Sequence, residues 1–240
     1  MKLKWDSTGE RFFEAGIDRC VLYQNAEGSF SNGVAWNGLL DVELKANSGD
    51  SFDGRLYRAD RLYDIAQGIP EYSGKLSCYT YPDEFEECIG YEEIMPGMYA
   101  SQQTRSIFGL SFRTLIGNDA EGIDLGYKIH LVYNCLAETN DKTRSTIRDN
   151  VTPLEIMYEF ETFSVDNTLT NRPTSEVILD SRKLTTGQLE LIESVLYGSD
   201  EEEPRMPFPE ELVTLLSSVS PDNTLYPYDD LYPDDDLYMR

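Results

Sequence analysis

The chain has 240 residues, 40% of them apolar and 12% aromatic, and its 44 acidic and 20 basic side chains give a net charge of −24. The apolar content excludes a wholly disordered chain. The charge argues against a surface that holds DNA or RNA phosphates, because such surfaces use Lys and Arg to displace counterions. No apolar run approaches the roughly 20 residues of a membrane-spanning helix, and the first residues lack the apolar core of a signal peptide. We therefore expect a soluble protein without a membrane partner, made and kept in the cytosol of the cell that expresses it.

Alternation of apolar and polar residues predicts a chain rich in β-strands. The clearest case is 127–136, in which Tyr127, Ile129 and Leu131 alternate with Lys128 and His130. The turn-rich link 117–126 joins this segment to a similar one before it and predicts a long hairpin. In chain order, the predicted strands are 17–24, 34–45, 72–81, 107–116, 127–136, 154–161 and 175–180.

One helix late in the chain is well marked. Thr185 and Gln188 have the spacing of a capping box, and Gly198 stands where helices commonly end. Leu189 lies on one helical face with apolar residues three and seven positions later. These signals predict a helix over 186–197.

The remaining signals complete a prediction of the fold. Proline opens two shorter helical segments, 82–88 and one that begins at Pro209. Strands do not alternate with helices, so we predict a mainly β fold, a β-sandwich of antiparallel sheets with a flanking α-helix. We assign 1–219 to this domain, with a long loop over 46–60, and we assign 220–240 to an acidic, flexible C-terminal tail.

Residues that could catalyse a reaction or bind a metal are sparse. The single histidine, His130, lies within a predicted strand, and no Ser or Cys motif pairs with it, so we interpret it as a packed residue. Cys20, Cys78, Cys88 and Cys135 show no CxxC spacing, which predicts reduced, buried thiols and offers no zinc site. We therefore predict that the protein is not an enzyme and that it uses no metal or cofactor.

Four segments stand out by their order and spacing: GVAWNGL at 33–39, CYTYPDEFEEC at 78–88, RSIFGLSFRTLIGND at 105–119 and GYKIHLVYN at 126–134. Together with the run at 145–149 and the step Arg172-Pro173-Thr174, they resemble the major tail protein family of long, non-contractile-tailed bacteriophages. The resemblance covers roughly residues 15–215. The segment 161–165 matches only loosely, and the acidic tail has no counterpart in the family.

This resemblance implies a structural subunit with the phage tail-tube fold, which stacks as hexameric rings into a hollow tube that conducts DNA during ejection. The implied partners are further copies of the chain, the tape measure protein, and the tail terminator and baseplate proteins, while DNA passes through the lumen without specific binding. The implied location is the virion, after assembly in the host bacterial cytoplasm. The alternatives are another tail component of the same fold, such as a terminator or a baseplate hub, and a stand-alone carbohydrate-binding β-sandwich.

Acids at every second position of two predicted strands are candidates for the lumen wall of such a tube. Negative charge there would repel phosphates and let DNA slide through, and alternate residues of a strand share one face. The alternative is that these acids form the solvated outer face of the sandwich. The candidates are Asp41, Glu43, Glu155, Glu159 and Glu161.

The loop over 46–60 is a candidate contact between rings. Its serines and glycines give it little reason to order by itself, so we expect it to be mobile in a free subunit and fixed between stacked rings. The candidate contact residues are Ser48, Asp50, Asp53 and Arg55.

The acidic tail repeats a Leu-Tyr step every six residues, at Leu225-Tyr226, Leu231-Tyr232 and Leu237-Tyr238. Proline and aspartate disfavour both helix and sheet, which predicts an extended tail. Either the tail keeps unassembled subunits apart by charge repulsion, or its leucines and tyrosines dock on a protein surface. The sequence favours repulsion, because like charges on every copy would otherwise meet at each repeat.

Overall fold

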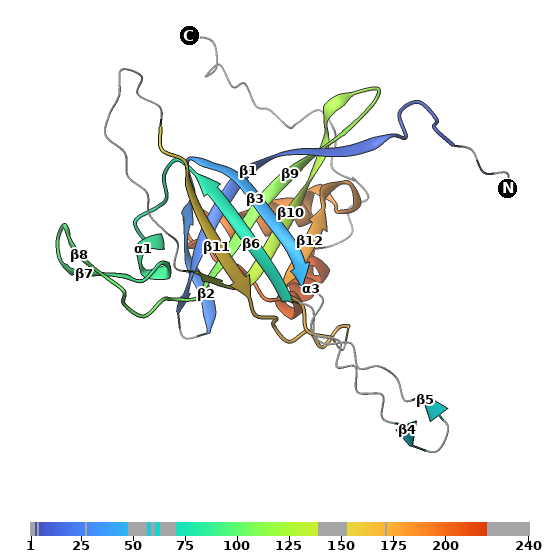
Figure 1. Ribbon diagram of the computed structural model, residues 1–240. Helices are drawn as coiled ribbons and strands as arrows, with labels where there is room; N and C mark the ends of the chain where they lie inside the picture. The colour runs from blue at the N-terminus through green and yellow to red at the C-terminus, as the bar shows by residue number, and fades with distance from the viewer. Residues whose placement is uncertain are drawn as a thin grey trace, which may run out of the picture. The chain divides into compact units, whose positions relative to one another are not determined.

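The computed structural model describes residues 3, 5–26, 28–47, 57–58, 61–62, 71–138, 153–170 and 172–219 (Figure 1). The chain divides into two units, the first of residues 1–35, 110–131 and 177–240 and the second of residues 36–109 and 132–176. The strands β9 (Phe108–Asn118) and β10 (Gly122–Ala137) contribute to both. The fold is mainly β, largely antiparallel, with a flanking helix, which confirms the predicted fold class.

Unit 1 combines long strands with two helices. Its further elements are β1 (Phe12–Ala26), β2 (Ser29–Ala35), β12 (Glu176–Asp180), the 3-10 helix η1 (Ser181–Lys183), α2 (Thr186–Tyr197) and α3 (Pro209–Ser218). The hydrogen-bonded order of its strands is β2-β1-β9-β10, and β12 also pairs with β10. β1 and β2 form an antiparallel hairpin.

Helix α2 begins and ends where the sequence predicts. The backbone N–H of Gln188 donates to Thr185 Oγ1 at 3.4 Å, and the backbone N–H of Thr185 donates to Gln188 Oε1 at 3.0 Å, which completes the capping box. Gly198 ends the helix with a φ of 82°. The buried Tyr23 of β1 donates its hydroxyl to the carbonyl of Leu196 at 2.8 Å. This contact fixes the C-terminal turn of α2 on the sheet of unit 1.

Helix α3 lies beside α2 in the same unit. Gln188 Nε2 donates to the carbonyl of Leu216 at 2.9 Å. None of the helices in the described part of the chain is long and apolar enough to cross a membrane.

Unit 2 contains shorter elements. They are β3 (Leu39–Asn47), β4 (Tyr57–Arg58), β5 (Arg61–Leu62), β6 (Glu71–Cys78), α1 (Phe85–Cys88), β7 (Tyr91–Met95), β8 (Met98–Ser101) and β11 (Ile156–Thr162). The strand order is β10-β11-β6-β3, and neighbouring strands are antiparallel. β4 pairs with β5, and β7 pairs with β8, as two separate antiparallel pairs.

The core of unit 2 is a cluster of aromatic rings around helix α1. Phe85 is fully buried, and its ring centroid lies 4.6 Å from that of Trp36, 5.1 Å from that of Tyr158 and 5.4 Å from that of Phe108. Tilted and edge-to-face arrangements of this kind add to the stabilisation that burial provides. Residues far apart in the sequence are therefore held together by one short helix.

Three local features differ from the predictions. The predicted strand 34–45 is interrupted by a turn at Gly38, whose φ of 85° suits glycine, so that β2 and β3 are separate strands. The predicted link 117–126 is shorter, because the side chain of Asn118 accepts hydrogen bonds from the backbone N–H groups of Ala120 and Glu121 and closes a tight turn. The hairpin of β7 and β8 was not predicted.

Candidate functional site

Three neighbouring strands of unit 2 present a charged surface to solvent. On one side of β3, β6 and β11, Leu76, Tyr158 and Phe160 are at most 3% exposed. The residues that alternate with them occupy the opposite side, here termed the β3–β6–β11 face. Its members are Asp41, Glu43, Lys45, Ser73, Lys75, Met157, Glu159 and Glu161, together with Ser77, which is only 8% exposed.

The strand register aligns the charges of this face in rows. Glu43 lies opposite Lys75, and Lys75 lies opposite Glu159 on its other side. Side chains that are directly opposite in antiparallel strands have Cβ atoms about 4.5–5.5 Å apart. Lys75 therefore stands between two carboxylates. In the next row, Ser73 separates Lys45 from Glu161. The face carries four acids and two lysines, which leaves it a net charge of −2.

The structure places four of the five predicted lumen acids together on this face. Asp41, Glu43, Glu159 and Glu161 are all exposed. Glu155 is also exposed but precedes the first residue of β11, so the strand register does not fix its place.

Sequence reasoning missed the two lysines on the same face. Lys45 could have been found, because it follows Glu43 by two residues on the same strand. Lys75 could not, because its place between two acids depends on which strands pair and in what register.

The candidate inter-ring residues Ser48, Asp50, Asp53 and Arg55 lie outside the described residues. Within the chain from 48 to 70, the structure describes only the strands β4 and β5. The acidic tail, 220–240, also lies outside the described part.

The residues with potential for catalysis or metal binding are engaged in packing. His130 is 9% exposed, its ring stacks on Phe112 at 4.8 Å, and its Nε2 lies 3.0 Å from Thr114 Oγ1. All four cysteines are buried and free, and burial raises the pKa of Cys78 to about 11 and that of Cys88 to about 12. Such thiols are weak nucleophiles and metal ligands at neutral pH. Among the described residues, no group of three or more His, Cys, Asp or Glu could hold a metal ion.

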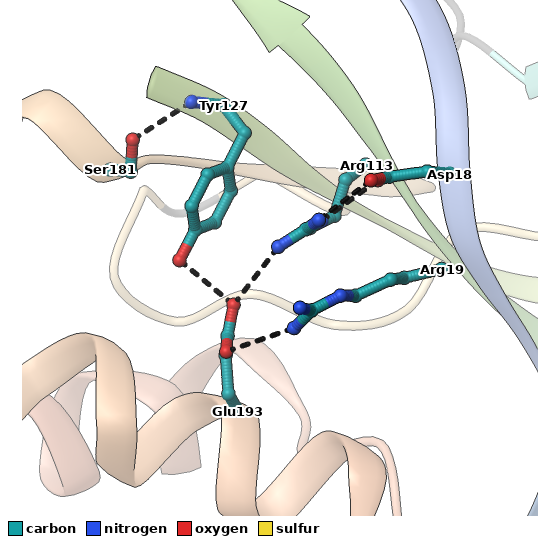
Figure 2. Close-up of polar contacts among 6 residues, drawn as sticks. All are labelled: Asp18, Arg19, Arg113, Tyr127, Ser181 and Glu193. Atoms are coloured by element: carbon teal, nitrogen blue, oxygen red, sulfur yellow. Dashed lines mark hydrogen bonds and ion pairs between the residues drawn. The ribbon is translucent and has the colours of Figure 1, made fainter. Parts of the chain in front are cut away.

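A second group of charges lies in unit 1 and is termed the Arg113 cluster, which comprises Asp18, Arg19, Arg113, Tyr127 and Glu193. The Arg113 side chain is 7% exposed and donates to both carboxylate oxygens of Asp18, at 2.8 and 2.6 Å. Glu193 of α2 accepts a hydrogen bond from Tyr127 Oη at 2.8 Å and lies 3.5 Å from Arg113 Nη1 (Figure 2). Arg19 Nη1 lies 3.4 Å from the other oxygen of Glu193.

The Arg113 cluster links helix α2 to strands β1, β9 and β10. Burial lowers the pKa of Arg113, but the hydrogen bonds and negative charge of Asp18 outweigh it and raise the pKa overall, so this guanidinium stays charged. It also lies over the Tyr127 ring, 4.4 Å from the centroid. The charged groups satisfy one another, which indicates a structural link rather than a catalytic site.

Sequence reasoning missed this cluster, although one signal was present. Glu193 follows Leu189 by four residues and precedes Leu196 by three, so helix geometry places this acid beside the buried face of α2.

The hairpin of β7 and β8 exposes apolar side chains around its turn. Ile94, Met95, Met98 and Tyr99 are each between 44% and 62% exposed. Apolar side chains gathered in this way commonly mark a protein-protein contact, so the hairpin is a second candidate surface.

No protein-family model matches the chain, and no curated protein matches it significantly.

Proposed function

We propose that the chain is a structural subunit of a bacteriophage tail tube and that it stacks as hexameric rings into a hollow tube. Its partners are then further copies of itself, the tape measure protein, and the terminator and baseplate proteins of the tail. The finished tube belongs to the virion and conducts DNA during ejection, after assembly in the host cytoplasm.

The observation that carries the proposal is where the resembling segments lie in the fold. Trp36 comes from the segment 33–39, Phe85 from 78–88 and Phe108 from 105–119, and the rings of Trp36 and Phe108 both pack against Phe85. The resemblance thus involves residues that build one core together. This supports a shared fold rather than a scattered coincidence of short motifs.

The β3–β6–β11 face supports the same proposal through its charge. A channel for DNA must avoid binding phosphates, and a wall of carboxylates does so by repulsion. Lys75 lies between Glu43 and Glu159 in the register, which reduces the attraction that this lysine would exert on DNA. In the proposed tube, this face lines the lumen.

The exposed hairpin of β7 and β8 supports the proposal because it offers a surface for contacts between subunits. A subunit that forms rings must carry apolar surface that only its neighbours cover. Met95 and Met98 are paired at the turn of the hairpin and are both more than half exposed. In the proposed tube, these side chains contact an adjacent subunit.

Negative-stain electron microscopy of the concentrated, purified protein tests the proposal. Hollow tubes of variable length are the expected result. A population that stops at single rings would instead favour a tail terminator. A protein that stays monomeric at high concentration and binds glycans would overturn the proposal in favour of a carbohydrate-binding module.

The loop over 46–60 offers a separate test of stacking. If Ser48, Asp50, Asp53 and Arg55 contact the next ring, then deletion of 48–53 leaves the fold intact and yields rings that do not stack. Circular dichroism checks the fold and microscopy counts tubes. Tubes of normal length in the deletion variant would remove this loop from the contact between rings.

A further inference from the structure

A pocket of about 330 Å³ lies in unit 1, between the hairpin of β1 and β2 and the C-terminal end of α2. Its volume is within the range of about 300–1,000 Å³ that is typical of ligand pockets. The described residues that line it are Arg19, Cys20, Val21, Gly33, Ala35, Tyr197 and Pro204.

The chemistry of this lining suits an apolar, aromatic ligand with little charge. Among the described residues that line the pocket, Arg19 is the charged one, and its guanidinium already lies 3.4 Å from Glu193 and 5.8 Å from the centroid of the Tyr197 ring. Tyr197 Oη is buried and has no hydrogen-bond partner in the described part of the chain. Buried hydroxyl groups usually have one, but this oxygen is closed to solvent, so a ligand in the pocket would contact the ring of Tyr197 and not its hydroxyl.

We propose that this pocket binds the segment Leu225-Tyr226-Pro227-Tyr228 of the chain's own acidic tail. Leucine, tyrosine and proline provide the apolar and aromatic surface that the lining favours. This inference does not depend on the proposed function. It favours docking of the tail over the account in which the tail acts only by charge repulsion.

The length of the chain supports this choice of segment. A Cβ atom on Gly187, at the start of α2, would lie 3.3 Å from Val219 Cγ1, so the described chain ends close to that helix end. From there to Tyr197 the helix rises about 15 Å. An extended chain covers about 3.3 Å per residue, so the six residues from Val219 to Leu225 reach about 20 Å. The first Leu-Tyr step therefore reaches the pocket with the shortest tether and the highest effective concentration.

The distribution of charge along the tail also favours the first of the three Leu-Tyr steps. Residues 200–203 are all acidic and line a neighbouring pocket that shares Tyr197 and Pro204 with the first. Acidic segments are repelled there. The first Leu-Tyr step lies in the uncharged run 223–228, whereas the run Asp234-Asp235-Asp236 separates the second step from the third.

Fluorescence anisotropy with a chain that ends at Ser220 tests this proposal. The probe is a labelled peptide of residues 221–230, and a labelled peptide of residues 231–240 is the comparison. We expect saturable binding of the first peptide and weaker binding of the second, because three acids directly follow Leu231-Tyr232-Pro233, although the net charge of the second peptide (−2) is smaller than that of the first (−3). The full-length chain should bind the first peptide at least about tenfold more weakly than the truncated chain does, because its own tail competes at high effective concentration.

Variants of both partners control the test. Ala35 is exposed on β2, so Ala35→Glu should fill and charge the pocket without disturbing the fold, and peptide binding should be lost. Ala46→Glu makes the same change at an exposed site on β3 and should bind normally. A peptide with Leu225, Tyr226 and Tyr228 replaced by serine keeps every acid, leaves the protein untouched and should not bind.

Two results would overturn the proposal. One is the absence of binding to the truncated chain, or binding that Ala35→Glu and the serine peptide leave unchanged. The other is equal binding by the truncated and full-length chains, which would mean that the tail does not occupy the pocket of its own chain.

Discussion

The two units attach a helix to their strands in different ways. In unit 2, α1 inserts the fully buried Phe85 among aromatic rings at centroid distances of 4.6 to 5.4 Å. In unit 1, α2 also buries leucine and isoleucine, but its Glu193 joins a network of charges around Arg113. Apolar contacts are non-directional and depend on area, whereas a buried ion pair stabilises only when its geometry is complete. The comparison predicts that the stability of unit 2 falls most when a core side chain loses volume. It predicts that the stability of unit 1 also falls when a buried side chain loses its charge.

The largest effect is expected from Phe85→Ala. This change empties the centre of the aromatic cluster, and large-to-small changes of phenylalanine in cores cost about 3–5 kcal/mol in free energy of unfolding. Urea denaturation measures the loss. Phe163→Ala in the same unit is the control, because Phe163 is 42% exposed and leaves no cavity. A loss below about 1 kcal/mol for Phe85→Ala would contradict the central role of this ring.

A smaller effect is expected from Arg113→Met, which keeps the volume and removes the charge. Breaking a fully buried pair costs about 3–5 kcal/mol. Asp18 is 38% exposed and can be rehydrated, so we expect about 2–3 kcal/mol, again by urea denaturation. Arg11→Met is the matched control, because the Arg11 side chain is 54% exposed where that of Arg113 is 7% exposed, and its pair with Asp119 should contribute below about 1 kcal/mol. Equal losses of unfolding free energy in both variants would show that burial does not increase the contribution of the Arg113 cluster to stability.

A pH effect is expected at the end of β12. Arg182 donates to both carboxylate oxygens of Asp180, at 3.0 and 2.8 Å, and these bonds lower the pKa of Asp180 despite its partial burial. A carboxyl whose pKa is lowered by folding adds stability that is complete above its unfolded pKa, near 4, and is lost as the pH falls through the folded pKa.

The free energy of unfolding should therefore decrease as the pH falls from about 5 towards 2, and about 0.5–1 kcal/mol of that decrease belongs to Asp180. Asp180→Asn should lose this part of the pH dependence. Urea denaturation at several pH values measures it. An unchanged pH profile in Asp180→Asn would contradict the assignment.

A small loss of stability is expected from the triple variant Glu155→Lys, Glu159→Lys and Glu161→Lys, in part because Glu159→Lys places a second lysine opposite Lys75. The three side chains are exposed, and exposed substitutions usually change stability by less than about 0.5 kcal/mol each. If the face lines a lumen, the variant tubes should assemble but eject DNA poorly, because lysines attract the phosphates.

A charge-matched control separates this effect from net charge. Glu190, Glu201 and Glu203 are exposed in unit 1, and their reversal to lysine changes the chain's charge by the same amount. Plaque counts and ejection assays compare the two triple variants. Normal infectivity of the variant at 155, 159 and 161 would remove those residues from the lumen.

Much of the fold could be predicted because its signals are local. The capping box of Thr185 and Gln188 and the glycine at 198 set the ends of α2, since each acts within a few residues of the chain. The alternation of 127–136 likewise predicts the core of β10. The dipeptide Asn37-Gly38 marks this turn in the sequence. The apolar residues on both sides of it nevertheless led to the prediction of one continuous strand over 34–45, where the structure has two.

Features that depend on contacts between residues far apart in the chain could not be predicted. The rows of the β3–β6–β11 face follow from the register of strands that are distant in the chain: Glu43 and Lys75 are 32 residues apart, and Lys75 and Glu159 are 84 residues apart. The pocket beside α2 combines Val21, Ala35 and Tyr197, which no periodicity connects. The sequence alone therefore determined which residues alternate, where helices are capped and how negative the chain is, because propensity, capping and charge are properties of neighbours in the chain. Only the tertiary structure decided which carboxylates flank a lysine, which ring fills the centre of a core and where a pocket opens, because pairing and packing join residues that the chain keeps far apart.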